Sequence, residues 1–531
     1  METIDISGQI LELEEDYHKK PWDKKLILLL IDVYQENNMW DKLIDMLKRL
    51  AELETDGNLK AGYFNTIGQI FQFETGSELD AVDYYNRALD ENIHISGSYH
   101  NLVNLLTSRE NWFLLERNIK RMITRIEKKD PGNHAVLFNL YYDLGDILYK
   151  NRNEIVQAVG AYKKSLEYSP GDSHVKKDLS VIFEQHNETF LDDAISLCEE
   201  ISINTPRDPD NLARLFRLYQ KAARYDESWC VASLLNSLGN TDKFTRDYFE
   251  RYNTSSSIPW KNFSGNGEFE KFIWKNPGDE FIEPLFIILA TVMAERFSKP
   301  WKKSGLRKEN AEVFTPDSPM FTSIFNKISE ILLKMPVKLF LVPELEGGIT
   351  RGIVRDDDNS IIPVVSVGGD MLSGLSEKEL VYHISRELFY YHPPRFLMKI
   401  MGSLSELYGL LLGSIRFADK NCVLDGDEEV IQTMASMIES FISPETASIL
   451  ESVVKKMISE TGIPSFQNYL YRIEASSIRV THALINDPAV SLKLLDDSQL
   501  IAKNQAENIL ISFLISEKYF QFRKNSGISI V

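Results

Sequence analysis

Residues 63–89 read YFNTIGQIFQFETGSELDAVDYYNRAL and contain two short apolar-periodic segments separated by a polar turn. Apolar side chains that recur every three or four residues form one face of an α-helix, so each segment is predicted to be an amphipathic helix. Small residues stand at Gly68, Ala81 and Ala88. We expect Gly68 and Ala81 to lie where the two helices approach most closely, because small side chains allow a close approach of backbones. The segment therefore predicts a hairpin of two helices.

The same pattern returns 77 residues later in the chain. The matched positions are small or aromatic in both copies: Gly68 and Gly145, Ala81 and Ala158, Tyr85 and Tyr162, Ala88 and Ser165. This offset is about twice 38 residues, which fits two helical hairpins with slightly long turns. The pattern resembles that of tetratricopeptide repeats, which carry small and aromatic residues at such positions. We expect Tyr85 and Ala88 to meet the first helix of the next hairpin.

Residues 1–250 as a whole are typical of a repeat array. They contain short amphipathic helices of roughly 12 to 16 residues joined by brief polar turns. We predict roughly five or six hairpins, several of them degenerate, stacked into an α-solenoid. Such arrays present an extended surface that binds a peptide or a helix of a partner. We therefore expect a protein or peptide partner; the alternative is that the array only supports the rest of the chain.

Length and charge limit the classes of function. The 531-residue chain is too long for one ordinary core, so several units are expected. It carries 59 Lys and Arg against 78 Asp and Glu, a net charge of −19. An acidic surface repels phosphate, which argues against broad nucleic-acid binding and against docking on an anionic membrane. The most apolar run, 284–294, is shorter than the ~20 residues that span a bilayer. We expect neither a nucleic-acid nor a membrane partner.

The cysteines favour a reducing compartment. Cys198, Cys230 and Cys422 are odd in number and contain no Cys-x-x-Cys pair, so neither a disulfide framework nor a thiolate zinc site is indicated. Cys230 is followed by apolar residues and is expected to be a buried thiol. The acidic first residues show no signal peptide. We therefore expect a cytoplasmic protein.

A second domain is predicted after a linker. Residues 251–268 are rich in Ser, Asn and Gly, which is typical of a linker. Residues 269–531 begin with two helices, at about 279–297 and 319–335. Short β-branched runs interrupted by acidic and Gly residues then predict a small antiparallel sheet at about 337–367, followed by more helices. The expected fold class is mainly α: a tetratricopeptide-like solenoid followed by an α+β domain.

Residues 377–392 are the most informative helix of this second domain. Ser376 and Glu379 have the spacing of a capping box, which fixes where the helix begins. Leu380, Ile384 and Leu388 form an apolar stripe. Glu387 lies beside or within that stripe, where a carboxylate is costly unless it is paired.

This helix resembles the active-site helix of zinc metallopeptidases of the gluzincin type, specifically the CAAX-prenyl-protease and heat-shock membrane protease family. The family has a Leu-Ser-x-x-Glu-Leu lead-in before His-Glu-x-x-His, and here those last five positions are occupied by residues 386–390, Arg-Glu-Leu-Phe-Tyr. The Glu is retained as Glu387, while both histidines are replaced, by Arg386 and Tyr390. The third ligand of the family comes from a later helix, here about 466–484, and Glu474 stands in that position. The whole chain resembles bacterial tetratricopeptide proteins with a degenerate domain of this kind.

The resemblance implies a former metal site without its metal. Arg cannot lose a proton to become a ligand, and Tyr is a poor replacement for imidazole. A guanidinium that binds a carboxylate would neutralise the charge that a lost zinc leaves behind. We therefore hypothesise a structural ion pair, either Arg386 with Glu474 or Arg386 with Glu387. No catalysis, metal or cofactor is expected.

Two other functions stay open beside this pseudoenzyme. A metal-dependent peptidase with substituted ligands would need zinc held by His383, Glu387, Glu474 and His482, with Glu387 as the catalytic group. A structural subunit of a larger assembly would bind no transient ligand. The leading hypothesis is a non-catalytic scaffold or adaptor that binds protein partners through the repeats; its oligomeric state is left open.

Overall fold

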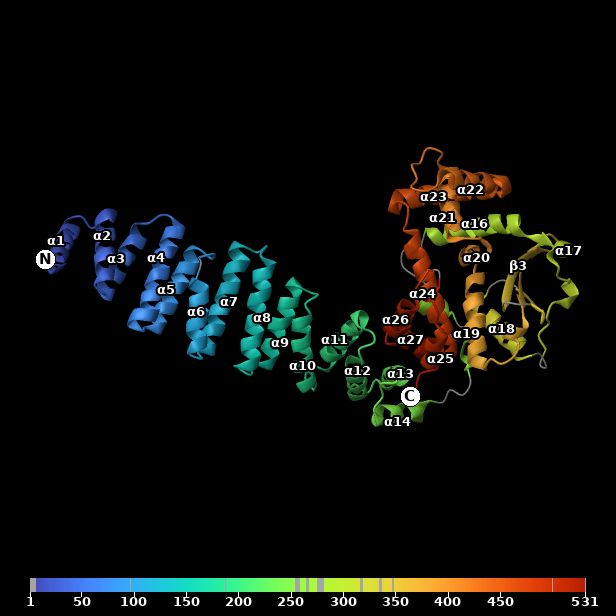
Figure 1. The fold of residues 1–531 in the computed structure, drawn as a ribbon, viewed down its shortest axis with the longest axis horizontal. Helices are drawn as coiled ribbons and strands as arrows, with labels where there is room; N and C mark the ends of the chain where they lie inside the picture. Colours follow the sequence, from blue (N-terminus) through green and yellow to red (C-terminus); the bar gives the residue numbers. More distant parts are fainter. Residues whose placement is uncertain are drawn as a thin grey trace. The chain divides into compact units, whose positions relative to one another are not determined.

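The computed structural model describes residues 6–530 with the exception of 96, 187, 254–257, 264–266, 275–280, 316–318, 334–336, 346–347 and 499. The chain is mainly α-helical and contains one small sheet (Figure 1). It divides into two compact units, Met1–Phe190 and Leu191–Val531. The fold class predicted from the sequence is confirmed: a helical-hairpin solenoid and an α+β part.

Unit 1 is a row of antiparallel helices that follow one another along the chain (Figure 1). The elements are α1 (Ile6–Lys19), α2 (Lys24–Glu36), α3 (Trp40–Leu53), α4 (Gly57–Ile70), η1 (Phe71–Thr75), α5 (Glu78–Glu91), α6 (Ser98–Ser108), α7 (Trp112–Lys129), α8 (His134–Lys150), α9 (Ile155–Tyr168) and α10 (Ser173–Gln185). The pairs α2/α3, α4/α5, α6/α7 and α8/α9 form hairpins, and each hairpin packs against the next.

The 77-residue repeat corresponds to the same contact in two hairpins. Tyr85 on α5 lies so close to Gly68 on α4 that a Cβ atom at Gly68 would be 2.7 Å from its Cδ1. Tyr162 on α9 lies over Gly145 on α8 in the same way, at 2.8 Å. Tyr85 was expected to meet the next hairpin: its ring packs against Gly68 within its own hairpin, and its hydroxyl group is hydrogen-bonded to Asn101 on α6, the first helix of the next one. The missing side chain of each glycine leaves room for the ring.

Unit 2 begins with four helices that continue the helical pattern: α11 (Leu191–Asn204), α12 (Pro209–Lys221), α13 (Tyr225–Ser237) and α14 (Lys243–Tyr252). The rest consists of α15 (Trp260–Phe263), η2 (Phe269–Trp274), α16 (Ile282–Phe297), β1 (Lys299–Pro300), α17 (Trp301–Ser304), η3 (Lys308–Asn310), α18 (Met320–Leu332), β2 (Lys338–Leu341), β3 (Ile349–Arg355), β4 (Ile361–Val367), η4 (Gly369–Met371), α19 (Glu377–Leu388), η5 (Phe389–Tyr391), α20 (Pro393–Ile400), α21 (Leu404–Ala418), α22 (Glu428–Phe441), α23 (Pro444–Thr461), α24 (Phe466–Ile485), α25 (Pro488–Leu494), α26 (Lys503–Leu514) and α27 (Glu517–Asn525).

Packing divides the chain at a different place from the sequence pattern. Helices α11–α14 lie within the predicted repeat region 1–250 but belong to unit 2, because α13 packs against α25 and α26. In the predicted linker 251–268, the described Ile258 and Phe263 are buried, and the Phe263 ring stacks on Phe522 with ring centroids 6.2 Å apart. The division at residue 250 stays a prediction from sequence pattern.

The sheet differs in topology from the expected antiparallel one. Its strand order is β1-β3-β4-β2; β3 and β4 are antiparallel, whereas β2 runs parallel to β4 and β1 runs parallel to β3. The sheet is therefore mixed. β4 is the most apolar of the strands, with Val364, Val365 and Val367 buried, and it occupies a central position rather than an edge. Burial of both of its faces favours this order over a simple meander.

Helices α19 and α24 pack side by side and are largely buried. The predicted capping box is present: Ser376 accepts from the Glu379 backbone N–H and Glu379 accepts from that of Ser376. The α-helix ends at Leu388, followed by the short turn η5; Pro393 and Pro394 start α20 rather than ending α19. Among the described residues, no helix is both long and apolar enough to cross a membrane.

Candidate functional site

Arg386 and Tyr390, which the sequence resemblance aligns with two histidines, converge on Glu474, which it aligns with a third ligand. Arg386 and Tyr390 lie at the C-terminal end of α19 and in η5, and both bind Glu474 on α24. Nη2 of Arg386 donates to Oε1 of Glu474, and the Tyr390 hydroxyl donates to Oε2. Each carboxylate oxygen therefore has its own donor. Of the two ion pairs hypothesised from the sequence, the structure forms Arg386 with Glu474.

Burial makes these contacts strong. The Glu474 residue is only 4% exposed, so its charge is poorly screened by water. Burial alone lowers the pKa of Arg386, but the charge of Glu474 raises it above its ordinary value. Burial and the same carboxylate raise the pKa of Tyr390, which keeps its hydroxyl protonated as a donor. The three side chains form a closed charge-neutral cluster.

Glu387, the retained glutamate, has partners that the sequence did not indicate. Arg351 on β3 binds it in a bidentate manner, with Nε 2.5 Å from Oε1 and Nη2 2.6 Å from Oε2. Lys399 on α20 lies 3.5 Å from Oε2. Although burial raises the pKa of Glu387, these two cations lower it below its ordinary value, so the group stays ionised. Arg351 and Lys399 are 36 and 12 residues away in sequence, and no local motif announces either contact.

A zinc ion does not fit this arrangement. The carboxylates of Glu387 and Glu474 are each held by cationic side chains, whose charge would repel a zinc ion at the same place. Arg386 has no lone pair to give. Among the described residues, no group of three or more His, Cys, Asp or Glu side chains is placed to hold a metal ion.

The alternative zinc set is not brought together. His482 is 1% exposed; its Nδ1 lies 2.9 Å from the Ser491 hydroxyl and its Nε2 lies 3.1 Å from the Tyr519 hydroxyl. Both ring nitrogens are thus used in the core. His383 is on α19, beside the ring of Tyr382 at 5.4 Å. The predicted cluster of His383, Glu387, Glu474 and His482 is wrong as a coordination site, because His482 faces α25 and α27 instead.

A pocket of about 460 Å³ lies beside Glu387, between the sheet and α20. Arg351 and Lys399 line it, together with apolar side chains such as Val354 and Phe396. Two cations share the single carboxylate of Glu387, and Lys299 also lines the pocket, so its wall carries a net positive charge. The Gly368-Gly369 pair after β4 has a packing role: a Cβ atom at Gly368 would be 2.1 Å from the Leu345 carbonyl oxygen.

In unit 1, the first helices of neighbouring hairpins touch along one face. The Tyr142 hydroxyl on α8 donates to Asp178 on α10 at 2.9 Å, and the Tyr149 hydroxyl donates to Gln185 at 2.7 Å. Ser98 on α6 donates to the Asn65 side chain on α4 at 2.7 Å. These contacts span 33 to 36 residues, close to one repeat. Polar side chains therefore join α4 to α6 and α8 to α10 along this face, and the two tyrosines are partly exposed.

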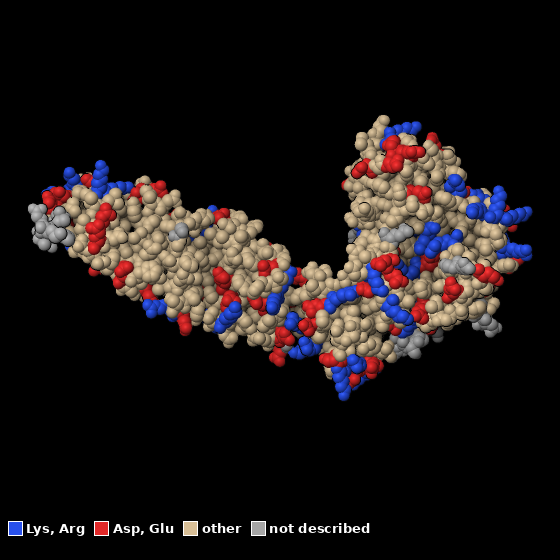
Figure 2. Space-filling model, viewed as in Figure 1, with Lys and Arg blue, Asp and Glu red and all other residues tan. Residues whose placement is uncertain are grey.

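Figure 2 shows one view of the charged side chains. On the visible face of unit 1, acidic and basic side chains are scattered and do not gather into a basic stripe.

The predicted packing residues of the repeats, Ala81, Ala88, Ala158 and Ser165, are buried. The three cysteines are free thiols, and burial raises the pKa of Cys230, as expected for an inert thiol.

Comparisons with known proteins concern the repeats. No family model and no curated protein matches the chain. Solved structures that are similar include a MamA fragment from Desulfovibrio magneticus (14% identity, 38% of this chain and 97% of that chain, TM-score 0.20) and YrrB, described as a tetratricopeptide protein with an unusual peptide-binding site (15%, 35% and 91%, 0.21). A repeat protein from Cytophaga hutchinsonii is similar over 46% of this chain and 94% of its own, at 17% identity and a TM-score of 0.23. At such TM-scores these likenesses carry no further argument; the repeat fold follows from the helical hairpins themselves.

Proposed function

We propose that this protein is a non-catalytic scaffold or adaptor that binds a protein partner through the first-helix face of unit 1, defined here as the face of α4, α6, α8 and α10. The observation that carries this proposal is the presence of partly exposed polar and aromatic side chains on this face, Asn65 on α4 and Tyr142 and Tyr149 on α8. Solenoid faces of this kind bind extended peptides or helices because each repeat adds the same kind of contact.

The chemistry of α8 and α10 suggests which partner segment would fit. Tyr142 and Tyr149 offer flat rings with hydroxyl groups, and Asp146 and Asp178 lie beside them. Tyrosine contributes a large contact area at a low entropic cost. A segment that carries both apolar and basic side chains is complementary to this surface.

Unit 2 is proposed to be a degenerate metallopeptidase-like domain without hydrolytic activity. The support comes from the three positions that correspond to the ligands of the family, where Arg386, Tyr390 and Glu474 bind one another instead of a metal. Glu387 is likewise held by Arg351 rather than facing a water molecule on zinc. A cytoplasmic location remains our expectation, since three free thiols are typical of a reducing compartment.

The first-helix face can be tested by site-specific crosslinking. A photoreactive amino acid at position 142 should capture a partner that the same amino acid at Lys164, an exposed residue of α9, does not. The partner is then purified and titrated against the full chain by calorimetry. Tyr142→Ala and Tyr149→Ala should each weaken saturable binding, while Lys164→Ala should leave it unchanged. Equal binding by all three variants would contradict the proposal.

A further inference from the structure

Unit 2 contains a cationic pocket of about 500 Å³ that is distinct from the Arg386 cluster. Its walls come from the end of α11, from η2, from α24 and from α26. Arg479 and Lys518 line it, and among the described residues of its lining there is no Asp or Glu. The pocket lining therefore carries a positive charge, although the chain as a whole has a net charge of −19.

Arg479 is the key group of this pocket. It projects from α24 and is partly buried. Among the described residues it has no carboxylate as an ion-pair partner, and the group that interacts with its charge is the side chain of Tyr471. Burial lowers the pKa of Arg479 because the charge is desolvated. A desolvated guanidinium without a counter-ion is costly, and a bound anion would offset that cost. Two other buried arginines of unit 2, Arg386 on α19 and Arg523 on α27, each have a carboxylate partner.

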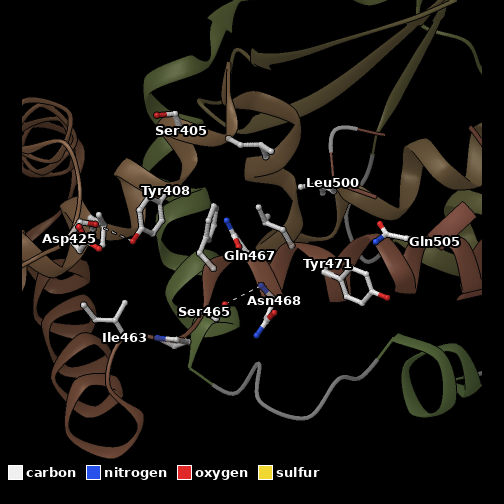
Figure 3. Close-up of a pocket in the computed structure, with 15 residues that line it drawn as sticks. Ser405, Tyr408, Asp425, Ile463, Ser465, Gln467, Asn468, Tyr471, Leu500 and Gln505 are labelled. Carbon is white, nitrogen blue, oxygen red and sulfur yellow. Dashed lines mark hydrogen bonds between the residues drawn. The ribbon is translucent and has the colours of Figure 1, made fainter. Parts of the chain in front are cut away.

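A larger pocket of about 950 Å³ adjoins the cationic one (Figure 3). The two share Tyr471 and Gln505, so those side chains form the boundary between them. The larger pocket is lined by apolar groups, including Leu412 and Phe466, and by the amides of Gln467 and Asn468. Its charged lining residue is Asp425, which lies at the far side from Tyr471 in Figure 3. The combined groove therefore has a cationic end, an apolar middle and an acidic end.

We propose that this groove binds the C-terminal segment of a partner polypeptide, with its free α-carboxylate on Arg479 and its last apolar side chains in the larger pocket. Guanidinium recognises carboxylate through paired, charge-assisted hydrogen bonds. The amide side chains of Asn468, Gln505 and Asn508 can pair with an extended peptide backbone. Asp425 favours a basic residue a few positions before the end of the peptide. The site lies in unit 2 and does not rest on the proposed role of the first-helix face.

Charge complementarity separates this occupant from others. A basic or neutral peptide end would leave Arg479 without a counter-ion. An internal peptide segment can offer a carboxylate only through an Asp or Glu side chain, which a peptide with a C-terminal carboxamide retains. A small organic anion could bind Arg479 but would leave the adjoining apolar pocket empty. The two pockets share Tyr471 and Gln505 in their linings, which favours a ligand long enough to occupy both.

The experiment uses the full chain and two pools of fluorescent random hexapeptides that differ only at the C-terminus, a free carboxylate or a carboxamide. Peptides retained by the protein are sequenced by mass spectrometry, and the best is resynthesised in both forms and titrated by fluorescence anisotropy. We expect the carboxylate form to bind roughly ten- to hundred-fold more tightly, the usual effect of one charge-assisted hydrogen-bond pair. Retained peptides should be enriched in apolar residues at the last two positions.

Variants assign the binding to this groove. Arg479→Gln should abolish the preference for the free carboxylate. Lys518→Gln, at the exposed rim of the pocket, should reduce that preference, and this second variant tests the site if Arg479→Gln does not fold. Arg307→Gln makes the same charge change outside both pockets and should leave affinity unchanged. Equal binding of the two peptide forms would overturn the proposal. It would also be overturned by unchanged binding in folded Arg479→Gln, or by acetate or inorganic phosphate that competes at concentrations as low as the peptide.

Discussion

Arg523, near the end of the chain, binds Asp226 at the start of α13 through two hydrogen bonds of 2.8 Å each. The Arg523 side chain is 1% exposed, lies 4.6 Å over the ring of Trp229, and also donates to the Asn486 side chain. The backbone N–H of Ile530 donates to the same aspartate. Helix α13 is thus fixed to the last helix of the chain, which explains why it packs with unit 2 although its sequence continues the helical repeats.

This ion pair predicts a large loss of stability. Arg523→Met leaves the Asp226 carboxylate buried without its partner, and we expect the free energy of unfolding of unit 2 to fall by about 3–5 kcal/mol. Lys524→Met at the neighbouring exposed position should have an effect within about 0.5 kcal/mol. Urea unfolding followed by tryptophan fluorescence measures both, since Trp229 reports directly on the site. Equal midpoints for the two variants would show that the pair does not hold α13 in place.

The close contact of Gly68 with Tyr85 predicts opposite effects of one substitution at two glycines of α4. Gly68→Ala should lower the free energy of unfolding by about 1–3 kcal/mol, because a methyl group overlaps the tyrosine ring. At Gly62, nothing lies within 4 Å of an added Cβ, so Gly62→Ala should stabilise the helix by about 0.5–1 kcal/mol. Urea unfolding followed by circular dichroism compares the midpoints. A destabilised Gly62→Ala variant would contradict the packing argument.

The fold was predictable where contacts are local. Gly68 and Tyr85 are 17 residues apart, and their spacing recurs, so periodicity alone indicated the hairpins. The sheet was only partly predictable: the β3–β4 pair is local, whereas the insertion of β4 between β3 and β2 depends on which strand is buried on both faces. The packing of α13 within unit 2 includes the pair of Arg523 and Asp226, which are 297 residues apart, and no sequence pattern links them.

The Arg386–Glu474 pair predicts strong coupling in a double-mutant cycle. Either Arg386→Met or Glu474→Met should cost about 3–5 kcal/mol, because each leaves one buried charge unpaired. The double variant should cost much less than the sum, since two apolar side chains replace both charges. Chemical denaturation of the four proteins gives the coupling energy. Additive losses would mean that the two groups do not stabilise each other.

His482 predicts that stability falls on mild acidification. Burial lowers its pKa from 6.5 to about 3, with Arg523 adding to this shift and Asp487 opposing it. The unfolded chain therefore binds a proton below pH 6.5 that the folded chain does not. This contribution to stability is complete above pH 6.5 and is lost as the pH falls towards 3; between pH 6.5 and 5 the loss is about 2 kcal/mol.

The measurement compares unfolding at pH 7.5, 6.5 and 5. His482→Gln retains polar groups next to Ser491 and Tyr519 but cannot titrate, so its stability should depend less on pH over this range. His94→Gln removes an exposed histidine and should keep the dependence of the unmodified protein. A pH dependence that His482→Gln leaves unaltered would show that other groups cause it.

The candidate site was predictable only in part. The spacing of Arg386, Glu387 and Tyr390 on one helix, and of Glu474 on a later one, could be compared with a motif because each motif is short. The partners of Glu387 could not be predicted from a motif, because Arg351 is on a strand and Lys399 is on another helix. The zinc set with His482 failed because the sequence shows that a residue is on a helix but not which neighbour its side chain faces.

Restoring the histidines tests the metallopeptidase resemblance itself. In the double variant Arg386→His, Tyr390→His, two imidazoles would stand beside Glu474, which no longer has a cationic partner, and would complete a set of two His and one Glu as in catalytic zinc sites. We expect close to one zinc per chain after dialysis, by elemental mass spectrometry. We expect none in the unmodified protein, where Arg386 and Tyr390 bind the carboxylate. Adding Glu474→Gln to the double variant should weaken the zinc binding.

The outcomes separate a pseudo-peptidase domain from an active peptidase. Zinc in the double variant would support a domain with the geometry of the metallopeptidase site. It would also show that the η5 turn can place the side chain at position 390 one helical turn from that at position 386. A folded double variant without zinc would show that α19 and α24 do not have that geometry, and the pseudo-peptidase proposal would fail. Zinc in the unmodified protein would instead revive the peptidase, and Glu387→Gln should then abolish any chelator-sensitive hydrolysis, because that carboxylate is the remaining candidate for activating water.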